Sequence, residues 1–169
     1  MADYYTPTVI QQTIPAADMT PLERLLLTRI LSSEPDGNGL YFYAEEGPSD
    51  LAVIDRGELE EALAASREAG GSRAARLVAE HLAQLGEDEA EAEVELDLSG
   101  GISWEAFLQD IVRRSSQLHY VSVISSFTCS KMRSDGFGGM AVLITAECIF
   151  GKSTDDLIVE FLKEAGFED

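Results

Sequence analysis

Residues 120–146 decide the fold of this chain. They begin with Tyr120-Val-Ser-Val-Ile-Ser-Ser-Phe127, continue through a glycine-rich turn, Asp135-Gly-Phe-Gly-Gly139, and end with Met140-Ala-Val-Leu-Ile-Thr-Ala146. Two β-branched, apolar runs separated by glycines are typical of a β-hairpin with a wide loop. Because they are the longest apolar runs in the second half of the chain, we expect this hairpin to form the centre of a sheet.

Five helical patterns precede or follow the hairpin. Each begins after a residue that can cap a helix N-terminus, and these residues are Thr20, Asp55, Ser72, Ser103 and Ser153. The segment that follows Thr20 carries the strongest start signal, because it combines a capping box with a proline at the first helical position. Apolar side chains recur at helical spacing along these segments, which gives each helix a face to pack against the sheet.

The remaining apolar runs predict short strands. Residues 40–44 and 51–54 are separated by a turn, and residues 94–98 alternate apolar and acidic side chains. Residues 1–19 are expected to be extended and to lie along a sheet edge, since their prolines exclude a helix. The segment Pro35-Asp-Gly-Asn-Gly39 is expected to be a turn that ends the first helix.

The order of these elements predicts an α+β fold, with an antiparallel β-sheet and helices packed against it. Residues 20–66 and 103–165 share the order helix, strand, turn, strand, helix, which is compatible with two αββα units. A length of 169 residues fits one domain. We therefore expect an extended segment at 1–19 followed by a single α+β domain at 20–169.

Charge is the strongest compositional signal. The chain has 31 acidic and 12 basic residues, which give a net charge of −19. Such a surface repels nucleic acid and anionic lipid, because binding to either depends on Lys and Arg. We therefore expect neither nucleic acid nor membrane as a partner, and favour another protein with a basic surface. The alternative is that the acidity only keeps the protein soluble.

Sequence motifs for targeting and for cofactors are missing. The first residues show no basic region followed by an apolar core, and no apolar run reaches 18 residues, so we expect a cytoplasmic protein. Cys129 and Cys148 form no Cys-x-x-Cys motif, so neither a metal nor another cofactor is expected. Ala146-Glu-Cys-Ile-Phe-Gly-Lys-Ser153 matches a relaxed phosphate-loop pattern, but its bulky apolar interior and the acids that follow it argue against phosphate binding.

Two segments are candidate partner-binding surfaces. The first is the run from residue 87 to 97, which has seven acidic residues and no basic one: Glu87, Asp88, Glu89, Glu91, Glu93, Glu95 and Asp97. The second is the hairpin loop, where Lys131 and Arg133 precede the aromatic anchor Phe137. Arg113 and Arg114 are expected to join the loop in one small basic spot. The same loop offers the rival hypothesis, a ligand-binding or thiol-dependent enzyme site in which Lys131, Arg133 and His119 activate Cys129.

Three stretches carry a resemblance to a known family. They are Tyr4-Tyr-Thr-Pro-Thr-Val-Ile-Gln-Gln-Thr13, Gly39-Leu-Tyr-Phe-Tyr-Ala-Glu-Glu-Gly-Pro48 and Phe127-Thr-Cys-Ser-Lys-Met-Arg-Ser-Asp-Gly-Phe-Gly-Gly139. With them, nearly the whole chain resembles a family of short, acidic, uncharacterised proteins carried by proteobacterial plasmids and mobile elements. The resemblance implies a role against host defence and transfers no activity or site residue. Our leading hypothesis is a non-enzymatic protein that binds a basic defence or DNA-processing factor, with DNA mimicry as one form of it.

Overall fold

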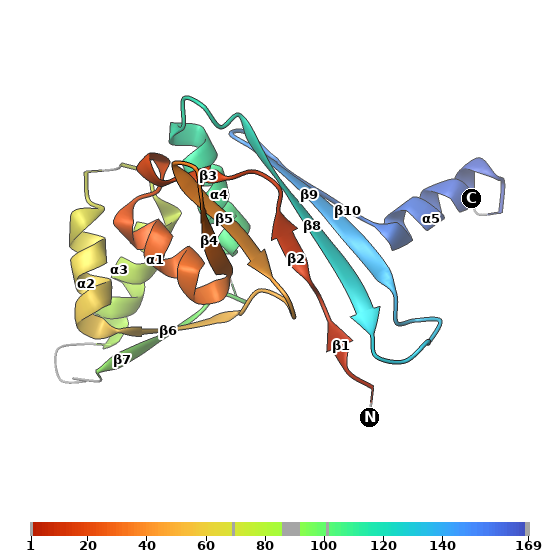
Figure 1. The fold of residues 1–169 in the computed structure, drawn as a ribbon, viewed down its shortest axis with the longest axis horizontal. Coiled ribbons are helices and arrows are strands. Elements are labelled where there is room, and N and C mark those ends of the chain that lie inside the picture. The colour runs from red at the N-terminus through yellow and green to blue at the C-terminus, as the bar shows by residue number, and fades with distance from the viewer. Residues whose placement is uncertain (1, 69, 86–91, 101, 168–169) are drawn as a thin grey trace.

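The computed structural model describes residues 2–68, 70–85, 92–100 and 102–167 of the chain (Figure 1). Within these residues the helices are α1 (Pro21–Ile30), α2 (Arg56–Ala65), α3 (Arg73–Leu85), α4 (Trp104–Arg114) and α5 (Thr154–Glu164), with a short 3-10 helix η1 (Ala16–Asp18). The strands are β1 (Tyr4–Tyr5), β2 (Thr8–Ile10), β3 (Ile14–Pro15), β4 (Ser32–Asp36), β5 (Gly39–Ala44), β6 (Leu51–Asp55), β7 (Glu93–Asp97), β8 (Tyr120–Cys129), β9 (Gly138–Thr145) and β10 (Ile149–Ser153). Each α-helix begins at the residue after its predicted cap.

The fold is α+β, as predicted, and an antiparallel sheet of eight strands is its main layer. The strand order is β10-β9-β8-β2-β5, with β1 beside β8 and both β3 and β4 beside β5. The predicted hairpin is formed by β8 and β9, which stay in register from the pair Tyr120–Thr145 to the pair Phe127–Gly138. Strand β8 lies between β9 and β2, so the hairpin reaches the middle of the sheet.

The N-terminal segment is extended through β3 and then forms η1, and the prediction that it lies along a sheet edge is wrong. Strand β2 lies inside the sheet, where Val9 pairs with Tyr43 of β5 on one side and with Ile124 of β8 on the other. Strand β2 can lie inside the sheet because it is short and begins after Pro7. No proline therefore interrupts its hydrogen bonds to β5 and β8.

Pairing in the first half differs from the expected αββα unit. Strand β5 pairs with β4, whose last two residues, Pro35 and Asp36, were predicted as part of a turn, and β6 pairs with β7 in a separate two-stranded sheet. The turn between β4 and β5 is confined to Gly37 and Asn38, and Gly37 has a φ of 57°, which glycine adopts without strain. Pro35 is tolerated in β4 because that strand lies at the edge of the sheet. The predicted hairpin of residues 40–44 and 51–54 is therefore absent.

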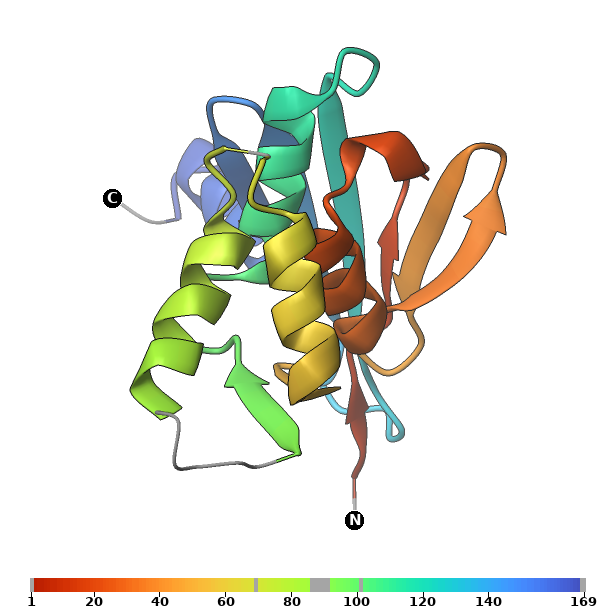
Figure 2. The ribbon, with the colours of Figure 1, turned by 90° about the vertical axis from the view of Figure 1, so that its left-hand side faces the viewer.

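Helix α4 packs on β8 and β9, and α1 packs on β4. Helix α2 packs on α1, and α3 packs on α1 and α4, so the four helices lie on one side of the main sheet and enclose the core (Figures 1 and 2). The fully buried side chains come from both layers and include Leu22, Leu26, Phe42, Phe107 and Ile111. Two buried carboxylates tie the helices together. Glu23 accepts hydrogen bonds from Ser72 and Arg114, and Asp110 accepts hydrogen bonds from the backbone and the guanidinium of Arg73. These partners offset the cost of burying two carboxylates in the core.

The last two elements form a C-terminal arm, residues 149–167, that leaves this layered body. Strand β10 extends the sheet, and α5 follows it with no intervening loop (Figure 1). In Figure 1 α5 lies beyond the sheet, on the side away from α1 to α4, and in Figure 2 it lies partly behind α4. None of the described residues of α5 is buried.

Candidate binding surface

The face of the sheet opposite the helices carries a row of side chains that the register brings together. Tyr43, Val9, Ile124, Ala141 and Lys152 are direct cross-strand neighbours from β5 to β10. Directly opposed residues project on the same side of a sheet, and successive residues alternate between its sides. The residues that alternate with them, such as Ile10, Phe42 and Val123, are buried on the helix side. The row therefore lies on the other side, which we call the open face.

Much of the open face is apolar, whereas an uncovered sheet face is ordinarily polar. A second row joins Leu143 of β9 to Phe150 of β10, and these side chains are 40% and 58% exposed. On β5 the rings of Tyr41 and Tyr43 stack with their centroids 5.5 Å apart. Aromatic and aliphatic side chains left exposed side by side mark an interaction surface.

Two shallow hollows divide the open face. The tyrosine hollow, of about 480 Å³, is lined by Pro7, Thr8, Val9, Glu34, Tyr41, Tyr43, Ala44, Glu45, Ile124 and Ser126. The arm hollow, of about 540 Å³, is lined by Ser122, Ile124, Ala141, Val142, Leu143, Ile149, Phe150, Gly151 and Lys152. Ile124 belongs to both hollows, so the two form one continuous surface across the sheet.

The rim of the tyrosine hollow is acidic. The hydroxyl of Tyr43 donates a hydrogen bond to Glu34 Oε1 at 3.0 Å. This hydrogen bond, together with the negative charge of Glu34, raises the pKa of Tyr43. Glu45 lines the same hollow. The hollow thus combines an aromatic floor with carboxylates at its margin, and the tyrosine hydroxyl stays protonated.

The acidic run lies on a different part of the molecule. Strand β7 forms the predicted half-buried strand, with Glu93, Glu95 and Asp97 exposed and the apolar residues between them buried. It pairs with β6 beside the helices, away from β8 to β10 (Figures 1 and 2). Hydrogen bonds from the side chain and the backbone of Ser99 lower the pKa of Asp97. The other predicted residues of the run, Glu87, Asp88, Glu89 and Glu91, lie outside the described residues.

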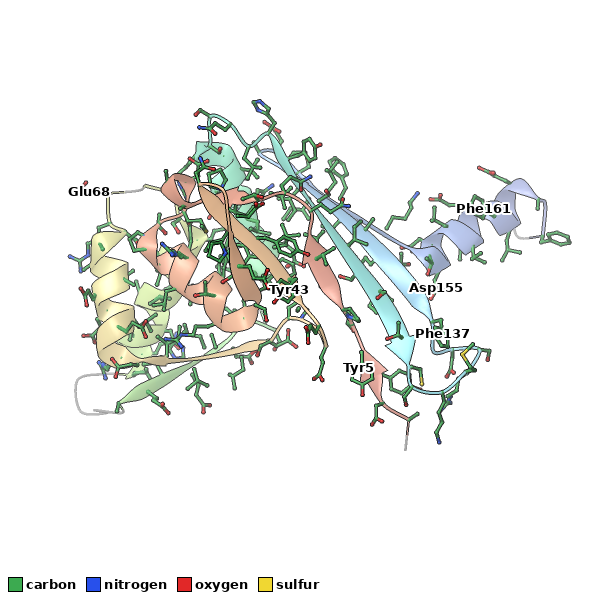
Figure 3. All side chains as sticks on the ribbon, viewed as in Figure 1. Tyr5, Tyr43, Glu68, Phe137, Asp155 and Phe161 are labelled. Atoms are coloured by element: carbon green, nitrogen blue, oxygen red, sulfur yellow. The ribbon has the colours of Figure 1, made fainter. Side chains whose placement is uncertain are left out.

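The hairpin loop does not form the predicted basic spot. Lys131 and Arg133 are exposed in the loop between β8 and β9, and Arg133 pairs with Asp135 at 3.2 Å. Phe137 is also exposed in this loop (Figure 3). Arg113 instead donates to the carbonyl of Ala146, just beyond the other end of β9. The eight residues of β9 separate the two ends by roughly 25 Å, so the loop and helix arginines cannot share one spot.

Cys129 lacks the histidine that the rival enzyme hypothesis places beside it. The thiol is buried at the end of β8, whereas His119 precedes the first residue of that strand, and ten strand residues span roughly 30 Å. The loop folds over the cysteine so closely that a Cβ added to Gly136 would meet Cys129 Cβ at 2.6 Å. Across the residues that the structure describes, groups of three or more His, Cys, Asp or Glu able to hold a metal ion are also absent.

The stretch that matched a phosphate-loop pattern is largely a strand. Residues 149–153 form β10, and α5 begins directly after it. The Ser153 backbone N–H donates to Asp156 Oδ2 at 2.8 Å, and Asp156 N–H donates to Ser153 Oγ at 3.1 Å. These two bonds complete a capping box. The Ser153 backbone N–H, together with the Ser153 hydroxyl, which donates to Asp156 Oδ2 at 2.7 Å, lowers the pKa of Asp156. The helix N-terminus is therefore occupied by its own carboxylate.

The open face was not identified from the sequence as a functional surface. A signal was present in β8, where the residues alternating with buried Val121 and Val123 include Ile124 in place of a uniformly polar set. The contributions of Leu143, Phe150 and the tyrosine pair depend on strand pairing between distant segments, which one-dimensional periodicity does not specify.

Comparison of the chain with protein-family models, with curated protein sequences and with solved structures gives no match to any of them. Among the described helices, none has the length and apolar character needed to cross a membrane.

Proposed function

We propose that this protein is a non-enzymatic binding protein that holds a segment of another protein in the tyrosine hollow. The observation that carries this proposal is the uncovered apolar face of the main sheet, with Tyr41 and Tyr43 stacked on it. Tyrosine is enriched at interfaces because it combines a large apolar ring with a hydrogen-bonding hydroxyl. A well-packed aromatic pair of this kind is typical of the residues that dominate binding energy.

The chemistry of the hollow favours a partner segment that is both apolar and basic. Val9, Ile124 and the tyrosine rings offer apolar contacts, while Glu34 and Glu45 offer carboxylates to Lys or Arg. The net charge of −19 extends this preference to long range, because an acidic surface speeds encounter with a basic partner. We expect the affinity to fall as salt is added.

A partner of this chemistry fits the hypothesis of a basic defence or DNA-processing factor. In the DNA-mimic form of that hypothesis, the carboxylates of β7 take the place of phosphates. They repeat about every 6.7 Å along one side of a strand, against about 3.4 Å per phosphate along a DNA strand, so the match in spacing is loose. We therefore give the tyrosine hollow the main role and the acidic strand a supporting electrostatic one.

Affinity capture from an extract of the native host, with four matched baits, tests this assignment. The baits are the wild-type protein, the double variant Tyr41→Ser/Tyr43→Ser, the triple variant Glu93→Lys/Glu95→Lys/Asp97→Lys, and Phe137→Ala. We expect a partner that the wild type, the triple variant and Phe137→Ala retain and that the tyrosine variant loses.

The other outcomes separate the candidate surfaces. Loss with the triple reversal alone would assign binding to the acidic strand, and loss with Phe137→Ala alone would assign it to the hairpin loop. A wild-type bait that enriches no protein over a bait-free matrix would overturn the proposed binding function itself.

A further inference from the structure

The C-terminal arm ends in a helix whose apolar side is uncovered. Leu157, Ile158, Phe161 and Leu162 recur at helical spacing on α5, and Ile158 and Phe161 are 55% and 56% exposed. Figure 3 shows Phe161 beyond the sheet, away from the helical layer. An isolated helix shorter than about 12–15 residues is only marginally stable in water, and α5 has 11 residues. Helix α5 therefore needs a surface to pack on.

The junction with β10 prevents α5 from folding back onto its own sheet. Ser153 ends the strand and caps the helix, so no loop residue remains to reverse the chain direction. Thr154 Oγ1 accepts a hydrogen bond from the Gly139 N–H at 3.1 Å, and Lys152 Nζ pairs with Glu160 at 2.6 Å. Together with the capping box, these contacts fix the direction in which α5 leaves the sheet.

The missing partner surface is present on the same molecule. The arm hollow is largely apolar and lies on the open face, next to the end of β10 from which α5 continues. No described residue of α5 lines it. In a two-fold symmetric dimer both copies use the same surface. When α5 of one copy packs into the arm hollow of the second, α5 of the second therefore packs into the arm hollow of the first.

We propose that the protein forms a homodimer in which α5 of each copy packs into the arm hollow of the other. This inference does not depend on the proposed function, because Tyr41 and Tyr43 do not line the arm hollow, although Ile124 lines both hollows. Seven exposed apolar side chains would be covered on each copy: Tyr120, Ile124, Leu143, Phe150, Leu157, Ile158 and Phe161.

The area is sufficient for a stable dimer. These seven side chains are between 37% and 58% exposed. Aromatic and aliphatic groups of this size then present on the order of 700 Å² per copy, close to the about 800 Å² that each partner buries in a standard interface. The negative charge of each copy opposes association, so salt should strengthen the dimer while it weakens binding of a basic partner.

Sedimentation equilibrium of the full chain at about 100 μM tests the dimer, with three variants for comparison. Phe161→Glu disrupts the helix surface and Phe150→Glu disrupts the hollow. Lys163→Gln is the matched control, because helical geometry places it on the side of α5 opposite the apolar side chains. We expect a dimer for the wild type and the control, and an increase in the dimerisation Kd of roughly 30-fold or more for each phenylalanine variant. Because both phenylalanines are exposed in the single chain, circular dichroism should show that both variants fold.

Mixing the two phenylalanine variants distinguishes helix-on-sheet packing from other dimers. Each variant alone has both of its symmetric contacts disrupted. A mixed dimer regains one intact contact, between the helix of Phe150→Glu and the hollow of Phe161→Glu, so mixing should restore partial association.

A monomeric wild type, or a dimer that withstands both phenylalanine substitutions, would overturn the proposal. Failure of the mixture to associate would also overturn it, because a helix-to-helix or sheet-to-sheet dimer gains nothing from mixing.

Discussion

Helices α4 and α5 have the same length, 11 residues, and in the sequence they stand before and after the same three strands, β8 to β10. They differ in how much of each helix is buried. Helix α4 precedes β8 and buries seven consecutive residues, Ala106–Val112. Helix α5 follows β10 and buries none of its described residues. Both carry apolar side chains at helical spacing, so their sequence patterns alone do not separate them.

The difference lies in what each helix uses to hold its place. Helix α4 is fixed along its length, because its apolar side packs on β8 and β9 and Gln109 donates to the carbonyl of Thr145 at 3.0 Å. Helix α5 is fixed at its N-terminus by its capping box and near its middle by the Lys152–Glu160 ion pair, and its apolar side makes no buried contact. A helix held in this way is ready to bind a second surface, whereas α4 has already used its apolar side.

Replacing one phenylalanine in each helix should give the largest difference between α4 and α5 in the free energy of unfolding. Phe107 is fully buried in α4, so Phe107→Ala should lower the free energy of unfolding by about 3–5 kcal/mol. Phe161→Ala in α5 removes an exposed ring and should cost about 0.5 kcal/mol or less in a dilute, monomeric sample. Urea denaturation followed by circular dichroism measures both values. Equal losses would mean that α5 is packed against the body of the same chain.

Breaking an ion pair should likewise cost more unfolding free energy in α4 than in α5. Asp110 is buried in α4, and Arg73 binds it through its backbone N–H and its guanidinium. Asp110→Ala leaves the partly buried Arg73 without its carboxylate and should cost about 3 kcal/mol of unfolding free energy. The matched change Glu160→Ala breaks a half-exposed pair with Lys152 and should cost less than about 1 kcal/mol. A larger loss for Glu160→Ala would show that the arm is part of the core.

Local patterns in the sequence predict most of the elements of this fold. Caps at Thr20, Asp55 and Ser153 place the helix starts correctly, because capping is a short-range interaction between neighbouring residues. Strand β7 is likewise predicted by its alternation of apolar and acidic residues. Pairing between strands is not predictable in this way. Strand β6 binds β7 and not β5, and nothing in its own residues specifies that choice.

The candidate surface was less predictable than the fold for the same reason. Tyr43, Val9 and Ile124 come from three distant segments, and only the register of β5, β2 and β8 makes them neighbours. The exposed side of α5 was also missed, since its spacing is the same as that of a helix packed on the core. Charge density, the feature that the sequence displays most clearly, marks β7, whose predicted role in partner binding stays a prediction.

The smallest effect should come from the N-terminal caps and should depend on pH. In α5 the carboxylate of Asp156 accepts hydrogen bonds from the backbone and the hydroxyl of Ser153, which lowers its pKa below the ordinary value of 3.8. A lowered pKa in the folded state means that the stabilisation is fully present above about pH 4 and is lost as the pH falls through the lowered pKa.

In α4 the side chain of Ser103 makes no cap hydrogen bond. We therefore expect Ser153→Ala to speed amide hydrogen exchange in the first turn of α5 at pH 6, by about 1 kcal/mol of local stability, and Ser103→Ala to change α4 far less. Asp156→Asn should remove the pH dependence of α5 exchange between pH 5 and 3, after correction for the intrinsic exchange rate. If α5 exchange in the wild type follows the intrinsic rate over that range, the cap does not hold the arm.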